Sequence, residues 1–247
     1  MRYFLSVLFL VLFSFAGHAQ KLRIAVAANA QYVAKKLQEA FQKETGMETE
    51  LVVSSSGKLT AQIRQGAPYH VFLSADLKYP QTLYQEGLTT GNPTVYAHGV
   101  LVLWSQEAAL LKGGVSALTN PAVKRIAIGN PKTAPYGEAA RQVLQKQQLL
   151  DKVRNKLVYG ESISQVNQYL LAGAVQVAFT SKSVVLEPAL QGKGSWQEVD
   201  AKLYAPLAQG VVVLKSAKGT QAQQAQRFYQ FLFSPQAKAI FKAYGYR

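Results

Sequence analysis

The chain has 247 residues, of which 49% are hydrophobic, and its 27 Lys and Arg against 13 Asp and Glu give a formal net charge of +14. This length suits one large domain or two small ones with a sizeable core. The basic residues are spread along the chain, so we expect a solvated basic surface, with a field that attracts anions as the alternative. The sequence has no Cys, which excludes a disulfide framework and a lipid-attachment cysteine.

The first residues, MRYFLSVLFLVLFSFAGHAQ, have the pattern of an export signal. One Arg precedes an apolar run from Tyr3 to Ala16, and small residues stand at Gly17 and Ala19. This pattern predicts a secretory signal peptide over residues 1–19. An uncleaved anchor is the alternative, although the run is short for a span of about 20 residues. We therefore expect a protein of the bacterial periplasm, and export argues against a nucleic-acid partner.

A short apolar strand, a small polar turn and an amphipathic helix recur along the chain. The five such units are LRIAVAANAQYVAKKLQEAFQKETG, TELVVSSSGKLTAQIRQG, YHVFLSADLKYPQTLYQEG, KRIAIGNPKTAPYGEAARQVLQKQ and KLVYGESISQVNQYLLAG. In the first, Leu22–Ala27 is a buried strand, and Val33, Leu37 and Phe41 recur on one helix face. Strands that alternate with helices predict an α/β fold with largely parallel sheets.

Two long apolar stretches, VYAHGVLVLWSQ and QGVVVLK, are predicted to be strands that cross between two lobes near Val100 and Val211. The final stretch, QAQRFYQFLFSPQAKAIFKAYGY, predicts two helices broken at Ser234 and Pro235. The expected bounds are residues 20–98 and 208–247 for lobe I and residues 99–207 for lobe II.

The turns between strands and helices are the candidate binding sites. A helix start leaves backbone N–H groups without partners and favours negative charge, so it is suited to an anion. Four turns combine small and polar residues: 27–29, 54–57, 134–137 and 161–163. Each could instead be an ordinary helix cap. All four follow strands, and ligands of parallel sheets bind at the carboxyl ends of strands. Serine hydroxyls would donate hydrogen bonds to an oxyanion without adding charge.

The sequence does not favour an enzyme. It contains no G-x-S-x-G, H-E-x-x-H, C-x-x-C or G-x-x-x-x-G-K-[ST] motif. His70 and His98 lie singly in predicted strands, where a structural role is expected. Asp76 and Glu161 are isolated carboxylates, which we interpret as helix caps or a hinge pair. We therefore predict a binding function without catalysis.

Several stretches occur together in the order found in a known family: RIAVAANAQ, SSSGKLTAQIRQGAPYHVFLSAD, YAHGVLVLWS, IAIGNPKTAPYGEAA and FKAYGY. By these stretches the chain resembles the periplasmic molybdate-binding proteins that serve ABC transporters. The resemblance implies a two-lobed type II periplasmic binding protein fold, in which each lobe is a mostly parallel sheet flanked by helices. It also implies an interlobe cleft for molybdate or tungstate, a membrane permease as partner, no cofactor and a monomeric state.

The resemblance also implies which residues bind the oxyanion: Ala28, Asn29, Ser56, Tyr136 and Ile163. Asn29 would donate from its side chain or backbone, Ser56 from its hydroxyl and amide, and Tyr136 and Ile163 from their backbone N–H groups. No side chain is expected to ligate the metal directly. Further candidates are Ser55, Gly57 and Thr180.

Two positions differ from many members of that family and keep other ligands open. Many members have Ser in place of Asn29 and Tyr in place of Thr180. One alternative is therefore the same scaffold binding another small anion, such as sulfate or an organic acid. A second alternative is an exported basic protein that binds a polyanion. A rigid ring of donors sized for molybdate would hold the smaller sulfate with stretched hydrogen bonds.

Overall fold

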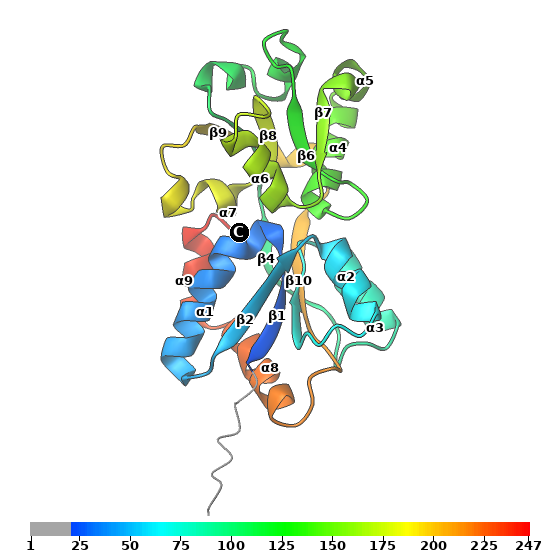
Figure 1. Cartoon of the computed structure of the whole chain (residues 1–247), viewed down its shortest axis with the longest axis vertical. Coiled ribbons are helices and arrows are strands. Elements are labelled where there is room, and N and C mark those ends of the chain that lie inside the picture. The colour runs from blue at the N-terminus through cyan, green and yellow to red at the C-terminus, as the bar shows by residue number, and fades with distance from the viewer. Residues whose placement is uncertain (1–20) are drawn as a thin grey trace, which may run out of the picture.

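The structure is a computed structural model that describes residues 21–247. The predicted signal peptide, residues 1–19, lies outside the described residues. Two five-stranded sheets lie one above the other along the long axis of the molecule, each flanked by helices (Figure 1). We call the sheet that contains the first strand, with its helices, lobe I, and the other sheet with its helices lobe II. The chain therefore has the predicted two-lobed α/β architecture.

Lobe I has the strand order β2-β1-β3-β10-β4. Its strands are β1 (Leu22–Ala27), β2 (Thr49–Ser54), β3 (Val71–Leu73), β4 (Thr94–Gly99) and β10 (Leu207–Val213). Its helices are η1 (Ala28–Ala30), α1 (Gln31–Thr45), α2 (Ser56–Arg64), α3 (Lys78–Gln85), α8 (Thr220–Phe231) and α9 (Pro235–Ala243).

Lobe II has the strand order β7-β6-β8-β5-β9. Its strands are β5 (Leu101–Ser105), β6 (Ile126–Gly129), β7 (Leu157–Gly160), β8 (Val177–Ser181) and β9 (Ser195–Glu198). Its α-helices are α4 (Pro135–Lys146), α5 (Leu150–Val153), α6 (Ile163–Leu171) and α7 (Lys182–Val185). Its short 3-10 helices are η2 (Ala108–Leu111), η3 (Gly114–Thr119), η4 (Arg154–Lys156), η5 (Pro188–Leu190) and η6 (Ala201–Leu203).

Both sheets are mixed, whereas mostly parallel sheets were expected. In lobe I, β1 pairs in parallel with β2 and β3, while β10 runs antiparallel to β3 and β4. Lobe II repeats this arrangement, with β6 parallel to β7 and β8, and β5 antiparallel to β8 and β9. The antiparallel pairs involve strands at the crossings, which join the sheet without the intervening helix that a parallel connection needs. The parallel halves are the strand–helix units of the sequence.

The chain crosses from lobe I to lobe II at the apolar stretch around Val100, where the sequence predicted a crossing. This stretch is two strands, β4 and β5, which belong to different sheets and are separated by Val100 alone. The return crossing leads into β10 (Figure 1). The lobe bounds at residues 98/99 and 207/208 stay a prediction.

The end of the described chain forms the two predicted helices, α8 and α9. The second begins where the sequence indicates, because Ser234 accepts a hydrogen bond from the Ala237 N–H at 3.1 Å and Pro235 stands in the first turn. Phe228 of α8 packs edge-on against Phe41 of α1, with ring centroids 5.1 Å apart. Burial of each such ring contributes roughly 1.5–3 kcal/mol to the stability of this face of lobe I.

Both faces of each sheet are covered. In lobe I, α1, α8 and α9 bury one face, while Leu59 of α2 and Leu83 of α3 pack near Phe72 on the other. Lobe II is built around Trp104 and Phe179, which are fully buried. Within residues 21–247, no helix has both the length and the apolar character needed to cross a membrane.

Candidate functional site

A small cavity lies between the lobes, where helix starts from both lobes meet. The positions within it that are open to the centre of a water molecule span about 10 Å³, so the space is tight. The residues that line it are Ala27, Ala28, Asn29, Ser55, Ser56, Ala75, Ala134, Pro135, Tyr136 and Ile163. None of these lining side chains carries a formal charge. All five residues that the resemblance implied as ligands lie at this cavity, although they come from four separate turns of the sequence.

The turns converge because each follows a parallel strand that ends at the interface. In lobe I, β1 leads into η1 and β2 into α2; in lobe II, β6 leads into α4 and β7 into α6. The first N–H groups of each helix have no partner within the helix, and the helix dipole makes this end positive. The backbone at Tyr136 and Ile163 belongs to the first turns of α4 and α6. The cavity is therefore surrounded by positive helix ends without any cationic side chain.

Two neighbouring serines differ in their hydrogen bonding. The Ser56 hydroxyl oxygen accepts a hydrogen bond from the Ala75 N–H at 3.0 Å, which leaves the hydroxyl hydrogen available to a ligand. The Ser55 Oγ is buried, and within the described chain it has no hydrogen-bond partner. A buried hydroxyl without a partner costs roughly 1–3 kcal/mol. Ser55 lines the cavity, so an acceptor placed there would remove this cost.

Asn29 directs its side chain away from solvent and toward other protein groups. Its Nδ2 donates to the Gln209 Oε1 at 3.0 Å and lies 3.5 Å from the Tyr246 Oη. Its carbonyl oxygen accepts a hydrogen bond from the Ser183 hydroxyl at 2.6 Å. With the side-chain amide used in this way, the backbone N–H is the group that Asn29 offers to the cavity.

The further candidates Gly57 and Thr180 have other partners. Gly57 donates its N–H to the Thr133 carbonyl at 2.9 Å, and an added Cβ would lie 2.9 Å from the Thr133 Cα. Thr180 is fully buried in β8 and donates to the Asn167 Oδ1 at 2.6 Å. Neither residue lines the cavity. Gly57 serves the close approach of the two lobes, for which a residue without Cβ is required.

Contacts at the rim of the cavity join the lobes. Lys58 at the start of α2 forms an ion pair with Glu161, which precedes α6. The Tyr79 hydroxyl donates to the Lys132 carbonyl at 3.0 Å. These contacts and the Gly57–Thr133 bond each connect one lobe to the other, so the structure is that of closed lobes.

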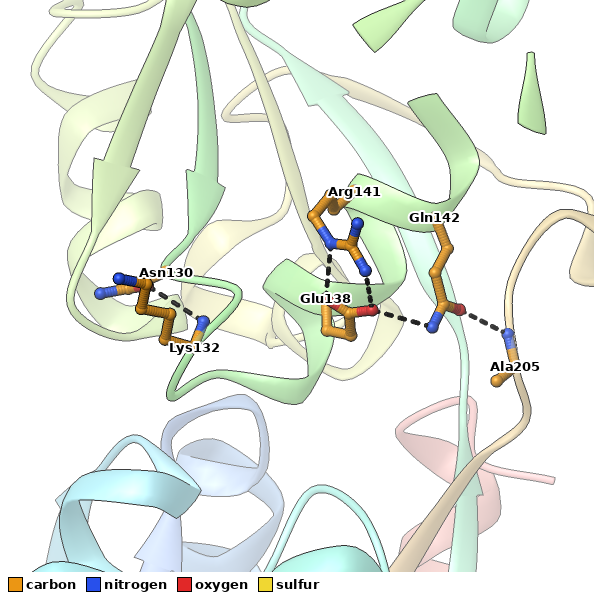
Figure 2. Close-up of polar contacts among 6 residues, drawn as sticks. All are labelled: Asn130, Lys132, Glu138, Arg141, Gln142 and Ala205. Atoms are coloured by element: carbon orange, nitrogen blue, oxygen red, sulfur yellow. Dashed lines mark hydrogen bonds and ion pairs between the residues drawn. The ribbon is translucent and has the colours of Figure 1, made fainter. Parts of the chain in front are cut away.

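The loop before α4 is held by local hydrogen bonds in lobe II (Figure 2). The Asn130 Oδ1 accepts from the Lys132 N–H at 3.0 Å, which forms a tight turn. On α4, Glu138 binds Arg141 and Gln142, and the Gln142 Oε1 accepts from the Ala205 N–H at 2.9 Å. The segment that returns to β10 is thereby tied to the helix that presents Tyr136.

The titratable groups noted in the sequence have structural roles. His70 is buried and accepts the Arg23 N–H at Nδ1. Asp76 accepts the Tyr79 N–H from the first turn of α3, and burial raises the pKa of its carboxyl. Burial also raises the pKa of Tyr136 well above its usual range, so its phenol is neutral beside the cavity. In the part of the chain from 21 to 247, no group of three or more His, Asp or Glu is arranged to hold a metal ion.

Among the lining residues, sequence reasoning missed Ala75, which lies outside the four predicted turns. Ala27, Ala75, Ala134 and Pro135 contribute small apolar surface rather than side-chain donors. Ala75 follows β3, which is parallel to β1, so the carboxyl-end rule could have found it. Gln209 lies behind Asn29 and outside the lining, and no pattern in the sequence indicates that these two residues meet.

Comparison with known proteins identifies the family. The family model of bacterial extracellular solute-binding proteins matches residues 22–247. The chain belongs to this family. The two-lobed fold and the prediction of a binding protein rather than an enzyme agree with this membership.

Individual relatives cover almost all of the chain. The molybdate-binding protein ModA of Azotobacter vinelandii is 38% identical over 232 residues, which are 94% of this chain and 91% of that protein. ModA of Rhodobacter capsulatus is 39% identical over 223 residues, with 90% and 86% covered. The solved structure of the Azotobacter vinelandii periplasmic molybdate-binding protein matches with a TM-score of 0.87 at 35% identity, covering 92% of this chain and 99% of that one.

Proposed function

We propose that this solute-binding protein captures molybdate or tungstate in the cavity between its lobes and delivers it to the membrane permease of an ABC transporter. The observation that carries the proposal is the lining of the cavity: neutral donors at helix starts from both lobes, with the Ser55 hydroxyl buried and unpaired within the described chain. The molybdate-binding relatives support the choice of ligand.

The donors match the chemistry of a tetrahedral dianion. The oxygens of molybdate only accept hydrogen bonds, and the backbone N–H groups of Ala28, Asn29, Tyr136 and Ile163 only donate. Ser56 donates from its hydroxyl and amide, and Ser55 adds a second hydroxyl. The helix dipoles supply the positive potential, so no Lys or Arg is needed at the anion.

Donors held in place by both lobes would make the site selective for the size of the anion. A cavity closed from both sides holds its donors at fixed positions, so sulfate, which is smaller, would leave some donors at stretched distances. Phosphate carries a proton at neutral pH, and this proton would face donors only. We therefore expect molybdate and tungstate to bind alike, and sulfate and phosphate to bind poorly.

The same proposal covers location and partners. The predicted signal peptide would export the chain to the periplasm, where it would act as a monomer. The permease would meet the closed form, since closure joins the exposed rims of both lobes. The net charge of +14 would favour the approach of anions to this surface.

A thermal melt of residues 20–247 tests the ligand. Molybdate, tungstate, sulfate and phosphate are added in turn at one salt concentration. A ligand bound only by the folded state adds about 2.7 kcal/mol of stability at one hundred times its Kd. We expect molybdate and tungstate alone to raise the melting temperature.

The other outcomes separate the alternatives. A shift with sulfate or an organic acid instead would mean that the scaffold is tuned to another small anion. A shift with polyphosphate or heparin that vanishes steeply with salt would indicate a polyanion-binding protein. Absence of any shift would overturn the proposal.

A further inference from the structure

Behind the cavity, a buried glutamine connects the two lobes. Gln209 of β10 is fully buried and does not line the cavity. Its Oε1 accepts hydrogen bonds from the Asn29 Nδ2 at 3.0 Å and from the Tyr96 hydroxyl at 2.7 Å. Its Nε2 donates to the Tyr136 hydroxyl at 3.2 Å. One amide therefore holds a cavity residue of lobe I and a cavity residue of lobe II together.

The surrounding backbone is adapted to this arrangement. The pairing of β10 with β4 shifts register between Gln209 and Gly210, and such an irregularity changes the direction of a side chain. Gly99 at the end of β4 has no Cβ, and an added Cβ would overlap both the Tyr136 hydroxyl and the Gln209 amide. The side chains of Gln209 and Tyr136 thus fill a space that only glycine at position 99 leaves open.

Both partners present backbone N–H groups at the cavity while their side chains bind Gln209. The distance between the Asn29 turn and the Tyr136 turn is therefore tied to the geometry of a single amide. The bond from Gln209 to Tyr136 crosses between the lobes. A buried hydrogen bond of this kind cannot stretch without leaving a donor unpaired.

We propose that Gln209 is a positioning residue that sets the spacing between the two halves of the anion site, and thereby the size of the oxyanion that the closed protein holds. This inference rests on the proposed function. According to it, part of the selectivity between large and small tetrahedral oxyanions comes from a residue that lies outside the cavity. Removing the bridge would let the lobes adjust their separation to the ion that is present.

The test is a double-mutant cycle with Gln209→Met and Tyr136→Phe, measured by isothermal titration calorimetry with molybdate and with sulfate. Gln209→Met keeps the length of the side chain without its hydrogen bonds, and Tyr136→Phe keeps the backbone N–H. We expect Tyr136→Phe, which removes one hydrogen bond of Gln209, to bind molybdate about tenfold more weakly, the upper range for one lost hydrogen bond. Gln209→Met removes three hydrogen bonds and should lose at least as much. The preference for molybdate over sulfate should fall in both, and the double variant should lose no more than Gln209→Met alone.

Gln176→Met is the matched control. The Gln176 Oε1 accepts the Lys124 and Arg125 N–H groups in lobe II, and it is not part of the cavity lining. This variant should keep the wild-type preference even if its melting temperature falls, because its hydrogen bonds do not connect the lobes.

Three results would overturn the positioning role: unchanged binding in Gln209→Met, losses that add in the double variant, or equal weakening for both anions. The last would mean that Gln209 only stabilises the closed fold. A wild-type protein that binds sulfate but not molybdate would overturn the proposed ligand instead. The double-mutant cycle would then test the positioning role through the sulfate affinities of the variants. Wild-type protein that binds neither anion would overturn both proposals.

Discussion

The Gly57 N–H donates to the Thr133 carbonyl at 2.9 Å, and this bond joins the start of α2 in lobe I to the loop before α4 in lobe II. Both segments adjoin cavity residues, Ser56 on one side and Ala134 on the other. The lobes therefore touch backbone to backbone beside the site, and the space around position 57 decides how closely they approach.

We expect Gly57→Ala to weaken molybdate binding by at least about fivefold, because overpacking at this contact costs typically 1–3 kcal/mol. The added Cβ would lie 2.9 Å from the Thr133 Cα, which faces it across the lobe interface, and 2.8 Å from the Tyr79 Oη of lobe I itself. Calorimetry measures the affinity, and small-angle X-ray scattering with molybdate measures closure. Gly91→Ala is the control, because an added Cβ there would meet no atom within 4 Å. Equal affinities of the two variants would contradict the prediction.

The two serines should respond to alanine substitution in different ways. Ser55→Ala removes a buried hydroxyl without a partner in the described chain, so the ligand-free protein should become more stable, by about 1 kcal/mol. Ser56→Ala leaves the Ala75 N–H without its acceptor, so the ligand-free protein should become less stable. Both variants should lose roughly 1–3 kcal/mol of molybdate binding. Urea unfolding and calorimetry measure the two effects, and wild-type affinity in either variant would remove that serine from the site.

The ion pair at the rim should contribute little. The side chains of Lys58 and Glu161 are 47% and 56% exposed, and exposed pairs are typically worth about 0–1 kcal/mol. A double-mutant cycle with Lys58→Ala and Glu161→Ala should give a coupling in molybdate binding within that range, and it should shrink as salt rises. A coupling well above this range that is insensitive to salt would mean that the pair is a principal latch of the closed form.

His70 should make folding stability sensitive to mild acid. Burial, together with the nearby positive charge of Arg23, lowers the pKa of His70 below its usual value near 6.5. Because the pKa of His70 is lower in the folded state, the unfolded chain binds the proton at a higher pH than the folded protein does. Stability is therefore fully present above about pH 6.5 and falls as the pH drops toward the folded pKa, by at most about 1.4 kcal/mol per pH unit.

Urea unfolding of wild type and His70→Gln at pH 7.5 and pH 5.5 measures this effect, with molybdate absent. The Gln side chain keeps an acceptor for the Arg23 N–H but does not titrate in this range. The wild type should lose more stability between the two pH values than the variant. An equal loss in both proteins would show that other groups cause the acid sensitivity.

The sequence by itself determined the units from which the protein is built and the turns that line the candidate site. Strand and helix periodicity is local, and helix starts carry their anion preference in the backbone, so the turns at 27–29, 54–57, 134–137 and 161–163 could be chosen without a structure. Only the tertiary structure decided how these turns are held. Asn29 and Gln209 are 180 residues apart, and their contact depends on the return of β10 between β3 and β4. The same return makes the sheet of lobe I mixed, because β10 runs antiparallel to β3 and β4. In lobe II the antiparallel strand is β5, which follows the first crossing. Local pattern specifies each element, whereas the spacing between the two halves of the site depends on packing between residues far apart in the chain.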